Sequence, residues 1–256
     1  MTGAAGGIGQ AIALALHRRG ATLVLSGRNA DGLEALRSRL GERAEVVLAD
    51  LSDTAAVPAL IEGAGAVDVL VANAALPGSG RFLDFEQEQI DRALDVNLRA
   101  PMTLARGLAP GMVERGAGHL VFISSLNGKV ATGGSSVYAA TKFGMRGFAF
   151  GLREDLRASG VGVTTVFPGF ISDAGMWADG GLSLPPGVGT RTPEQVADAV
   201  VSGITKGRAE IDVAPLSLRL GGWVAGVSPS AMAAVNRRLG SERMSDALAA
   251  AQRDKR

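Results

Sequence analysis

The feature that most constrains the fold of this chain is a regular alternation of two kinds of segment. Short runs of aliphatic and β-branched residues, typical of buried strands, alternate with longer runs whose apolar residues recur at helical spacing. Strands separated by helices pair in parallel, and the helices then cover both faces of the sheet, so the sequence predicts a doubly wound α/β fold. The expected strands are 22–26, 45–50, 67–73, 119–125, 161–167 and 210–214, and the expected helices are 7–19, 30–40, 53–63, 86–115, 135–158, 193–206 and a stretch from 216 to the end.

Length and charge narrow the class of protein. A chain of 256 residues suits one sizeable core, so we expect a single domain. The formal net charge of +1 argues against nucleic acid as a partner. Basic residues do gather near the end of the chain, where a solvated helix end explains them better than a nucleic-acid or membrane patch. These residues are Arg237, Arg238, Arg253, Lys255 and Arg256.

Composition excludes several kinds of chemistry. The chain has no cysteine, which rules out disulfides and thiolate catalysis, and its two histidines, His17 and His119, are far apart in sequence. We therefore expect no metal site. No apolar run approaches the ~20 residues of a membrane span, and the first residues lack a positively charged leader. The sequence predicts a cytoplasmic protein without a membrane span.

The strongest chemical signal is the spacing of one tyrosine and one lysine. Tyr138, the only tyrosine in the chain, stands four residues before Lys142 in the stretch SSVYAATKFGM. In a helix this offset places both side chains on one face. A nearby ammonium favours the phenolate, so we expect Lys142 to lower the pKa of Tyr138 from its ordinary value of ~10. Such a tyrosine suits general acid–base catalysis, with a packed surface aromatic as the alternative.

A glycine-rich run stands directly before the first predicted helix. In TGAAGGIG, residues 2–9, the glycines allow the backbone to approach a pyrophosphate, and the free amides of the helix start can hold it. A structural turn would explain the run equally well by itself. Together with the predicted strand 22–26 and the acidic residue Asp50 at the end of the next strand, the run indicates a dinucleotide site.

With these motifs in place, the chain resembles the short-chain dehydrogenase/reductase family up to about residue 206. The matching motifs, in the family's order, are TGxxxGxG at 2–9, Asp-Leu at Asp50 and Leu51, ANAA at 72–75 in place of NNAG, Asn97 in DVNL, Ser125, YxxxK at Tyr138 and Lys142, and PG at Pro168 and Gly169. The resemblance implies a Rossmann-like domain with a core at 1–170, a substrate lid at 171–193 and C-terminal helices at 194–256. It also implies cofactor contacts from Gly3, Gly7, Ile8, Gly9, Arg28, Asp50, Leu51, Asn73, Ala74, Tyr138, Lys142, Pro168, Gly169 and Ile171.

The resemblance implies a mechanism as well. Ser125 would bond the substrate oxygen, Tyr138 would transfer a proton to or from it, and Lys142 would hold the nicotinamide ribose. Asn97 would anchor a water for proton relay. The reaction would interconvert an alcohol and its ketone or aldehyde by hydride transfer. Taken singly, these residues have plainer explanations, with Ser125 as a cap at a strand end and Asn97 as a backbone partner within its helix.

The end of the second predicted strand bears on the choice of nucleotide. An enzyme that uses NAD normally places an acidic residue here, whereas a guanidinium suits the 2′-phosphate of NADP. The segment 25–29 has no carboxylate and contains Arg28. We expect NADP(H), with NAD(H) as the second choice. A surface arginine that leads a helix is the alternative, and Gly6, not a basic residue, stands at the family's other NADP-favouring position.

Three departures from the family's pattern bear on the site. Ala75 replaces a glycine and adds a methyl group near the expected cofactor ribose. Asp173 stands where the family often has a threonine that bonds the nicotinamide carboxamide, so Ile171 would serve through its backbone. The family's first strand, a central one, is missing before Thr2, which would leave its two neighbours unpaired with a cleft between them. We expect the true start to lie upstream of Met1, with a truncated form of low stability as the alternative.

Two functions therefore remain. The first is an NADP(H)-dependent oxidoreductase, supported by Ser125, Tyr138, Lys142 and Asn97. The second is a non-catalytic nucleotide-binding scaffold or sensor, for which the missing strand and Asp173 are the arguments.

Substrate and assembly follow from less specific features. The substrate would be a small apolar carbonyl compound or alcohol if the lid lines the pocket, although its side chains would equally well pack the lid onto the core. These side chains are Met176, Trp177, Leu182 and Leu184. The long helices 86–115 and 135–158 would pair copies into a homodimer or homotetramer. The segment after residue 216 is open to three explanations, namely a pocket wall, an oligomer contact or a membrane surface.

Overall fold

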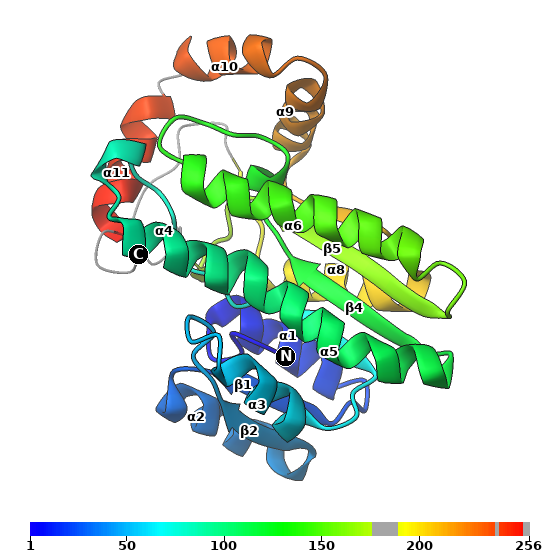
Figure 1. The fold of residues 1–256 in the computed structure, drawn as a ribbon. Coiled ribbons are helices and arrows are strands. Elements are labelled where there is room, and N and C mark those ends of the chain that lie inside the picture. The colour runs from blue at the N-terminus through cyan, green and yellow to red at the C-terminus, as the bar shows by residue number, and fades with distance from the viewer. Residues whose placement is uncertain (176–188, 239–240, 253–256) are drawn as a thin grey trace.

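The predicted alternation of strands and helices forms a parallel sheet between two helix layers (Figure 1). The computed structural model describes residues 1–175, 189–238 and 241–252. Among these residues the sheet has a two-stranded part in the order β1-β2 and a four-stranded part in the order β3-β4-β5-β6, and every pairing is parallel. The strands are β1 (Leu23–Gly27), β2 (Ala44–Leu48), β3 (Val69–Ala72), β4 (Gly118–Ile123), β5 (Val161–Pro168) and β6 (Glu210–Val213). All six lie where the sequence predicted them, with small shifts at their ends.

Helices cover both faces of the sheet because the aliphatic strands are apolar on both sides. On one face, α1 and α8 pack Ile12 and Val200 against β4 and β5, and α2 joins them over β1. On the other face, α3, α5 and α6 bury Leu104 and Met145 with Phe122 of β4. The helices of these layers are α1 (Gly7–His17), α2 (Ala30–Leu40), α3 (Ala56–Ala64), α5 (Ala100–Arg115), α6 (Ser136–Asp155) and α8 (Pro193–Lys206). The doubly wound architecture is therefore confirmed.

The predicted helix 86–115 is not one continuous α-helix. It consists of α4 (Gln87–Leu94), a π-helical turn at Asp95–Arg99, and α5. A capping box between Glu86 and Gln89 starts α4, and Gly116 ends α5 with a φ of 64°. The wider turn falls at Asn97, whose side chain is fully buried and bonds another segment of the chain. Turns of this kind are often found at functional sites.

The two parts of the sheet are joined by the first four residues. The Thr2 N–H donates to the Val71 oxygen of β3 at 3.0 Å, and the Ser26 N–H of β1 donates to the Met1 oxygen at 2.9 Å. The Met1 ammonium donates to the Val24 oxygen at 2.6 Å, and burial lowers its pKa to about 6. Residues 1–4 therefore stand between β1 and β3, where the sequence analysis expected a strand to be missing.

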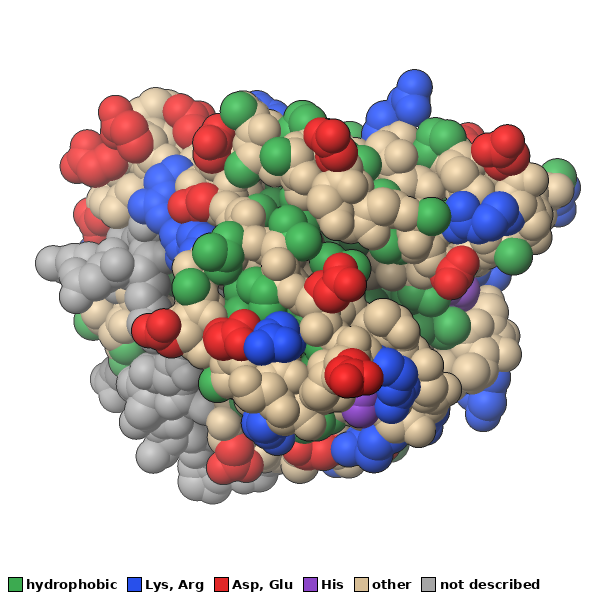
Figure 2. Space-filling view, turned by 90° about the horizontal axis from the view of Figure 1, so that it is seen from below, with side chains coloured by type: hydrophobic (Ala, Val, Ile, Leu, Met, Phe, Trp, Pro, Cys, Tyr) green, Lys and Arg blue, Asp and Glu red, His purple; other side chains and the backbone are tan. Residues whose placement is uncertain are grey.

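Beyond this short junction the two strands are not bonded to each other. A cavity of about 30 Å³ lies beside Met1, lined mainly by aliphatic side chains that include Val24, Leu70 and Leu104. Figure 2 views the molecule from below, the side of α2, α3 and β2 in Figure 1, and shows hydrophobic side chains gathered along the middle of this face with charged ones around them. The expected gap between the two neighbouring strands is thus present, and it is filled only in part.

In its described residues, the chain after β6 forms three helices instead of the single stretch predicted from 216 onward. They are α9 (Leu216–Val227), α10 (Pro229–Arg238) and α11 (Ser241–Gln252). Ser228 separates the first two helices, and Pro229 begins α10, because proline is tolerated in the first turn of a helix but not in its interior. Within the described parts of the chain, none of the helices combines the length and apolarity that crossing a membrane requires. The predicted lid residues Met176, Trp177, Leu182 and Leu184 lie outside the described residues.

Candidate active site

The carboxyl end of β4 and the first turns of α6 bring the predicted catalytic side chains together. Ser125 follows β4 in extended backbone, and its Oγ accepts the N–H of Asn127 at 3.2 Å. The Ser125 side chain lies close enough to the phenol of Tyr138, in the first turn of α6, to lower the pKa of that phenol. A turn fixes one of these two hydroxyl side chains, and a helix fixes the other.

Lys142 lies one further turn along α6 on the same side as Tyr138, as the offset of four predicted. Its side chain is 1% exposed, and its Nζ donates to the Ile123 oxygen at 3.1 Å and lies 5.5 Å from the centre of the Tyr138 ring. An ammonium carries three N–H donors, so this bond leaves two for another partner. Burial lowers the pKa of Lys142 to about 8.

The pKa of Tyr138 moves in the direction opposite to the sequence expectation. In the protein without ligand, burial raises the pKa of Tyr138 to about 12, and the hydrogen bond from Ser125 opposes this rise only in part. The Lys142 ammonium lies 5.5 Å from the ring centre and donates to the Ile123 main-chain oxygen, and it is not among the groups that shift the pKa of Tyr138. The expectation that Lys142 alone lowers this pKa is therefore wrong for the unliganded protein.

Asn97 bonds backbone, but in a different segment from its own helix. Its Oδ1 accepts the Leu76 N–H at 2.7 Å, and its Nδ2 donates to the Leu76 oxygen at 2.9 Å. Nδ2 also lies 3.4 Å from Thr141 Oγ1, and the Thr141 hydroxyl donates to the main-chain oxygen of Tyr138 at 2.8 Å. Asn97 thereby ties the segment after β3 to the turn of α6 that carries Tyr138 and Thr141. Sequence reasoning missed Thr141, which lies between the two predicted catalytic residues of α6.

The glycine loop is tightly folded against the end of β3. A side chain at Gly3, whose φ is +62°, would lie 2.8 Å from the Ala74 Cα, and one at Gly9 would lie 2.1 Å from the Gly3 oxygen. Thr2 Oγ1 accepts the N–H groups of Asn73 and Ala74, both at 3.1 Å. These contacts explain why the loop needs glycine at two positions. They also bring Asn73 and Ala74 next to the loop, as predicted.

Among the described residues, no side chain caps the N-terminus of α1. Its N-cap is Gly6, which has no side chain, and its first turn holds no acidic residue. Gly6 and Gly7 are exposed, and Ile8 is partly exposed. Free first-turn N–H groups and the positive end of the helix dipole suit a phosphate group. The residues present therefore fit the diphosphate of a dinucleotide.

Arg28 and Asp50, predicted separately as nucleotide contacts, lie near each other. Arg28 Nη1 is 3.8 Å from Asp50 Oδ2, and both side chains are about half exposed. Asp50 also accepts the Ser52 N–H at 3.0 Å and the Ser52 hydroxyl at 2.7 Å, which hold its pKa below the ordinary value against the opposing effect of burial. Leu51 beside it is buried. This pairing keeps the Arg28 guanidinium at the carboxyl edge of the sheet.

The segment after β5 lies at the same edge. Pro168 is the last residue of β5, and the Gly169 N–H donates to the Val213 oxygen at 3.0 Å. Ile171 forms a bridge with Arg191 through the Phe170 oxygen and the Ser172 N–H, so the bridge does not use the N–H or oxygen of Ile171 itself. Asp173 is exposed and has a φ of 60°. Its side chain thus points to solvent from a left-handed turn.

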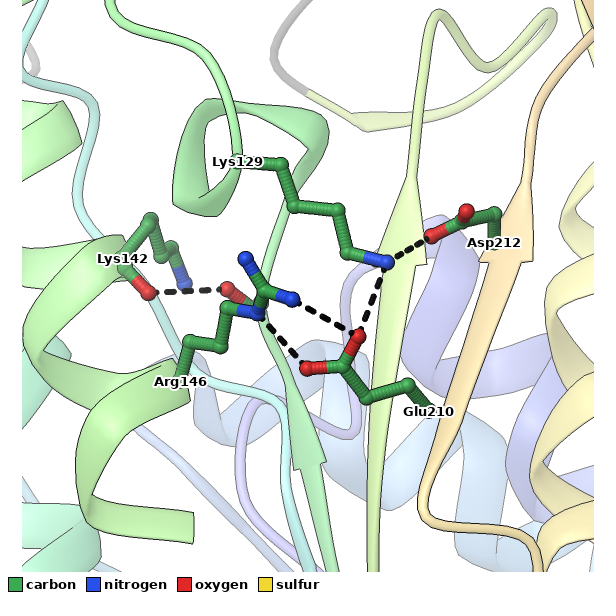
Figure 3. Close-up of polar contacts among 6 residues, drawn as sticks. Lys129, Lys142, Arg146, Glu210 and Asp212 are labelled. Carbon is green, nitrogen blue, oxygen red and sulfur yellow. Dashed lines mark hydrogen bonds and ion pairs between the residues drawn. The ribbon is translucent and has the colours of Figure 1, made fainter. Parts of the chain in front are cut away.

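Four charged side chains, Lys129, Arg146, Glu210 and Asp212, form a group of ion pairs next to Lys142 (Figure 3). Lys129 Nζ lies 2.6 Å from Asp212 and 3.0 Å from Glu210, both on β6. Arg146, one turn beyond Lys142, bonds Glu210 through Nε at 2.6 Å and Nη2 at 3.1 Å. The Ser124 hydroxyl donates to the Lys142 oxygen at 3.2 Å. The loop after β4 and helix α6 are therefore both anchored to β6, an arrangement that the sequence analysis did not anticipate.

Comparison with known proteins agrees with this fold and this arrangement of residues. Residues 1–181 match the family described as short chain dehydrogenase. The chain is 36% identical over 220 residues to the ketoacyl reductase HetN of Nostoc sp. strain PCC 7120, covering 83% of this chain and 77% of that protein.

Solved structures are similar too. A short-chain dehydrogenase from Sphingobium yanoikuyae in complex with NADPH superposes with a TM-score of 0.78 at 31% identity, covering 90% of this chain and 94% of that one. A metagenomic short-chain oxidoreductase in complex with NADP gives a TM-score of 0.70 at 32% identity over 83% and 93% of the two chains. The chain belongs to the short-chain dehydrogenase/reductase family of oxidoreductases, and its fold is a single Rossmann-like domain.

Proposed function

We propose that the protein is an NADP(H)-dependent oxidoreductase that interconverts an alcohol and its ketone or aldehyde. The observation that carries the proposal is the convergence of Ser125, Tyr138 and Lys142, in which two neighbouring hydroxyl side chains lie near a buried ammonium. The nicotinamide, when bound, supplies or accepts the hydride. The complete set of three side chains favours catalysis over a scaffold or sensor of the same fold.

The chain's own residues handle the substrate oxygen and its proton. Ser125 donates a hydrogen bond to that oxygen, while Tyr138 gives it a proton in reduction and takes one in oxidation. Lys142 uses its two remaining N–H donors for the ribose and, once positioned, offsets the rise in the pKa of Tyr138 that burial causes. The Asn97 side chain is already engaged with Leu76, so a relay water would bind the main-chain oxygen of Asn97.

The nucleotide would lie along the carboxyl edge of the sheet. Gly3, Gly7, Ile8 and Gly9 would hold its diphosphate, Asp50 and Leu51 its adenine, and Arg28 its 2′-phosphate. Asn73, Ala74, Pro168, Gly169 and Ile171 would line the remainder. The two similar structures that hold NADPH and NADP support this choice of nucleotide over NAD(H).

Substrate class and assembly are further parts of the proposal. We favour a small apolar carbonyl compound or alcohol, which accords with the name of the ketoacyl reductase among the relatives. Exposed apolar side chains on α5 and α6, among them Met102, Val113, Phe143 and Phe150, suit pairing of copies into a homodimer or homotetramer. Residues 1–170 would act as the core, 171–193 as the lid and 194–256 as the C-terminal helices.

The variant Tyr138→Phe tests the proposal. It removes the proton-transferring hydroxyl and little else, so we expect turnover in a screen of carbonyl substrates with NADPH to fall by about 10²- to 10⁴-fold. Binding of NADPH, followed by fluorescence, should stay within about twofold of wild type, since the phenol is not the main nucleotide contact. Unchanged turnover in this variant would overturn the proposed mechanism, and full biological activity without turnover would favour the scaffold.

A further inference from the structure

Helix α9 buries small residues and exposes large apolar ones, which is the opposite of the usual packing of a surface helix. Its small residues Gly222 and Ala225 are buried, and a methyl group at Gly222 would lie 3.9 Å from the Lys129 Cβ. Its large apolar residues face outward on a single stripe, since positions 216, 220, 223, 224 and 227 fall on one side of a helix. Their exposed fractions are 64% for Leu216, 56% for Leu220, 70% for Trp223, 38% for Val224 and 71% for Val227.

This stripe is costly to leave in water. An apolar surface gains roughly 25 cal/mol for each Å² removed from water, and a tryptophan is among the largest such surfaces. Surface helices of water-soluble domains normally turn this side to the core. The stripe on α9 therefore indicates an apolar environment outside the chain, at the end of the molecule where α9 and α10 project in Figure 1.

The charges around the stripe favour an anionic partner. Between Asp212 and Glu242 the sequence has no acidic residue, whereas it has Arg219, Arg237 and Arg238. Arg219 is exposed on α9 itself. A short helix with a tryptophan, aliphatic residues and an exposed arginine suits the boundary between lipid head groups and acyl chains. Anionic head groups would pair with Arg219.

A second copy of the chain fits this stripe less well. A helix of 12 residues is about 18 Å long, so a stripe about 10 Å wide covers only about 180 Å². Stable protein interfaces bury about 800 Å² on each partner. A two-fold contact through α9 would also bring Arg219 toward its own copy with no acidic residue of the same segment to balance it. Area and charge both argue against this occupant.

We propose that α9 docks the protein on an anionic membrane surface, with Leu220 and Trp223 inserted between the lipid head groups. Docking of this kind is peripheral and needs no spanning helix. It does not depend on the proposed oxidoreductase activity, because it rests on the exposure and charge of α9 alone.

Co-sedimentation of the 256-residue chain with lipid vesicles tests the proposal. We expect binding to phosphatidylglycerol vesicles, little binding to phosphatidylcholine vesicles, and weaker binding when salt rises from about 50 mM to about 500 mM. The double variant L220S/W223S should bind about tenfold less or weaker still, because it removes the two inserted side chains. Arg219→Glu should weaken binding to phosphatidylglycerol alone. Leu83→Ser, a matched change at a side chain that is 92% exposed on another element, should bind like wild type.

Three results would overturn the proposal. The first is the absence of wild-type binding to either kind of vesicle. The second is equal vesicle binding by wild type and L220S/W223S, when the double variant also gives the wild-type melting curve. The third is a fall in native mass for L220S/W223S in sedimentation velocity without vesicles, which would make the stripe a contact between copies. Turnover is not a readout in any of these, so failure here leaves the oxidoreductase proposal unaffected.

Discussion

At the scale of single residues, burial pushes the two central groups of the site toward their neutral forms. It raises the pKa of Tyr138 to about 12 and lowers the pKa of Lys142 to about 8. Both directions follow from the cost of a charge in a poorly solvated place. Helix geometry predicted that the two side chains lie on one face. It could not predict whether burial or the nearby ammonium has the larger effect on the pKa of Tyr138, because burial is a property of the whole fold.

Arg28 provides a prediction on nucleotide choice. Replacing it with alanine removes the guanidinium proposed to bond the 2′-phosphate, and bonds to charged groups contribute about 1.5–3 kcal/mol. We therefore expect KM for NADPH to rise by about ten- to a hundredfold in Arg28→Ala, while KM for NADH changes by less than about twofold. Steady-state kinetics with both nucleotides, and Arg28→Lys as a control that keeps the charge, measure this. Equal rises for both nucleotides would contradict the assignment.

His119 gives a prediction on acid stability. Burial lowers its pKa to about 4, and its Nε2 lies 2.8 Å from Thr164 Oγ1. Because Thr164 donates its own proton to the Arg208 oxygen at 2.6 Å, it accepts from Nε2–H, which leaves Nδ1 unprotonated against Gly162.

The unfolded histidine binds a proton below about pH 6.5 and the folded one only near pH 4, so stability falls as the pH drops through this window. From pH 7 to pH 5 the free energy of unfolding should fall by about 2 kcal/mol on account of His119. Urea titrations should show a smaller fall in His119→Asn. An identical pH dependence in the two proteins would refute this account.

At the scale of elements, residues far apart in sequence hold the site in place. Lys129 follows the Ser125 loop and pairs with Asp212 and Glu210 on β6, while Arg146 of α6 pairs with Glu210. Pattern reading could not find this network, since nothing in the spacing of a loop, a helix and a distant strand marks them as neighbours. The π-helical turn at Asn97 was also missed, since the helical spacing of apolar residues continues through it. The break before α10 had a local signal in Pro229, and reading it would have divided the predicted helix.

The ion network predicts a loss of stability in Lys129→Met. Removing the lysine leaves two partly buried carboxylates with less compensation, and their remaining contact with solvent moderates the loss to about 1–2 kcal/mol. Chemical denaturation measures this directly. Lys206→Met, which removes an exposed lysine at the end of α8, should change the free energy of unfolding by less than about 0.5 kcal/mol. A loss no larger than that of Lys206→Met would rule out a stabilising role.

At the scale of the whole molecule, the alternation of strands and helices was enough to predict the doubly wound fold. Parallel strands buried on both faces leave few other arrangements. The division of the sheet between β1 and β3 was also expected, because the sequence lacks the family's first strand before Thr2. The actual junction, with the Thr2 N–H on Val71 and the Ser26 N–H on Met1, depends on main-chain hydrogen bonds that no side-chain pattern encodes.

The proposed nucleotide preference should be visible in global stability. A ligand that binds only the folded state at about a hundred times its Kd raises the free energy of unfolding by about 2.7 kcal/mol. We expect NADPH to raise the Tm of the full chain by several degrees and NADH to raise it less at equal concentration. Arg28→Ala should lose most of the difference between the two. The same shift with both nucleotides would contradict the preference for NADP(H).

The burial of Tyr138 has a spectroscopic consequence. As the chain has one tyrosine, every change in ultraviolet absorbance that accompanies phenolate formation comes from this residue alone. With a pKa of about 12, Tyr138 stays a neutral phenol at neutral pH in the free protein, and the phenolate absorbance is absent. Any ligand that moves the ammonium of Lys142 toward the phenol oxygen would bring the transition to lower pH. The ultraviolet absorbance of the protein therefore reports on the proposed active site without a label or a substitution.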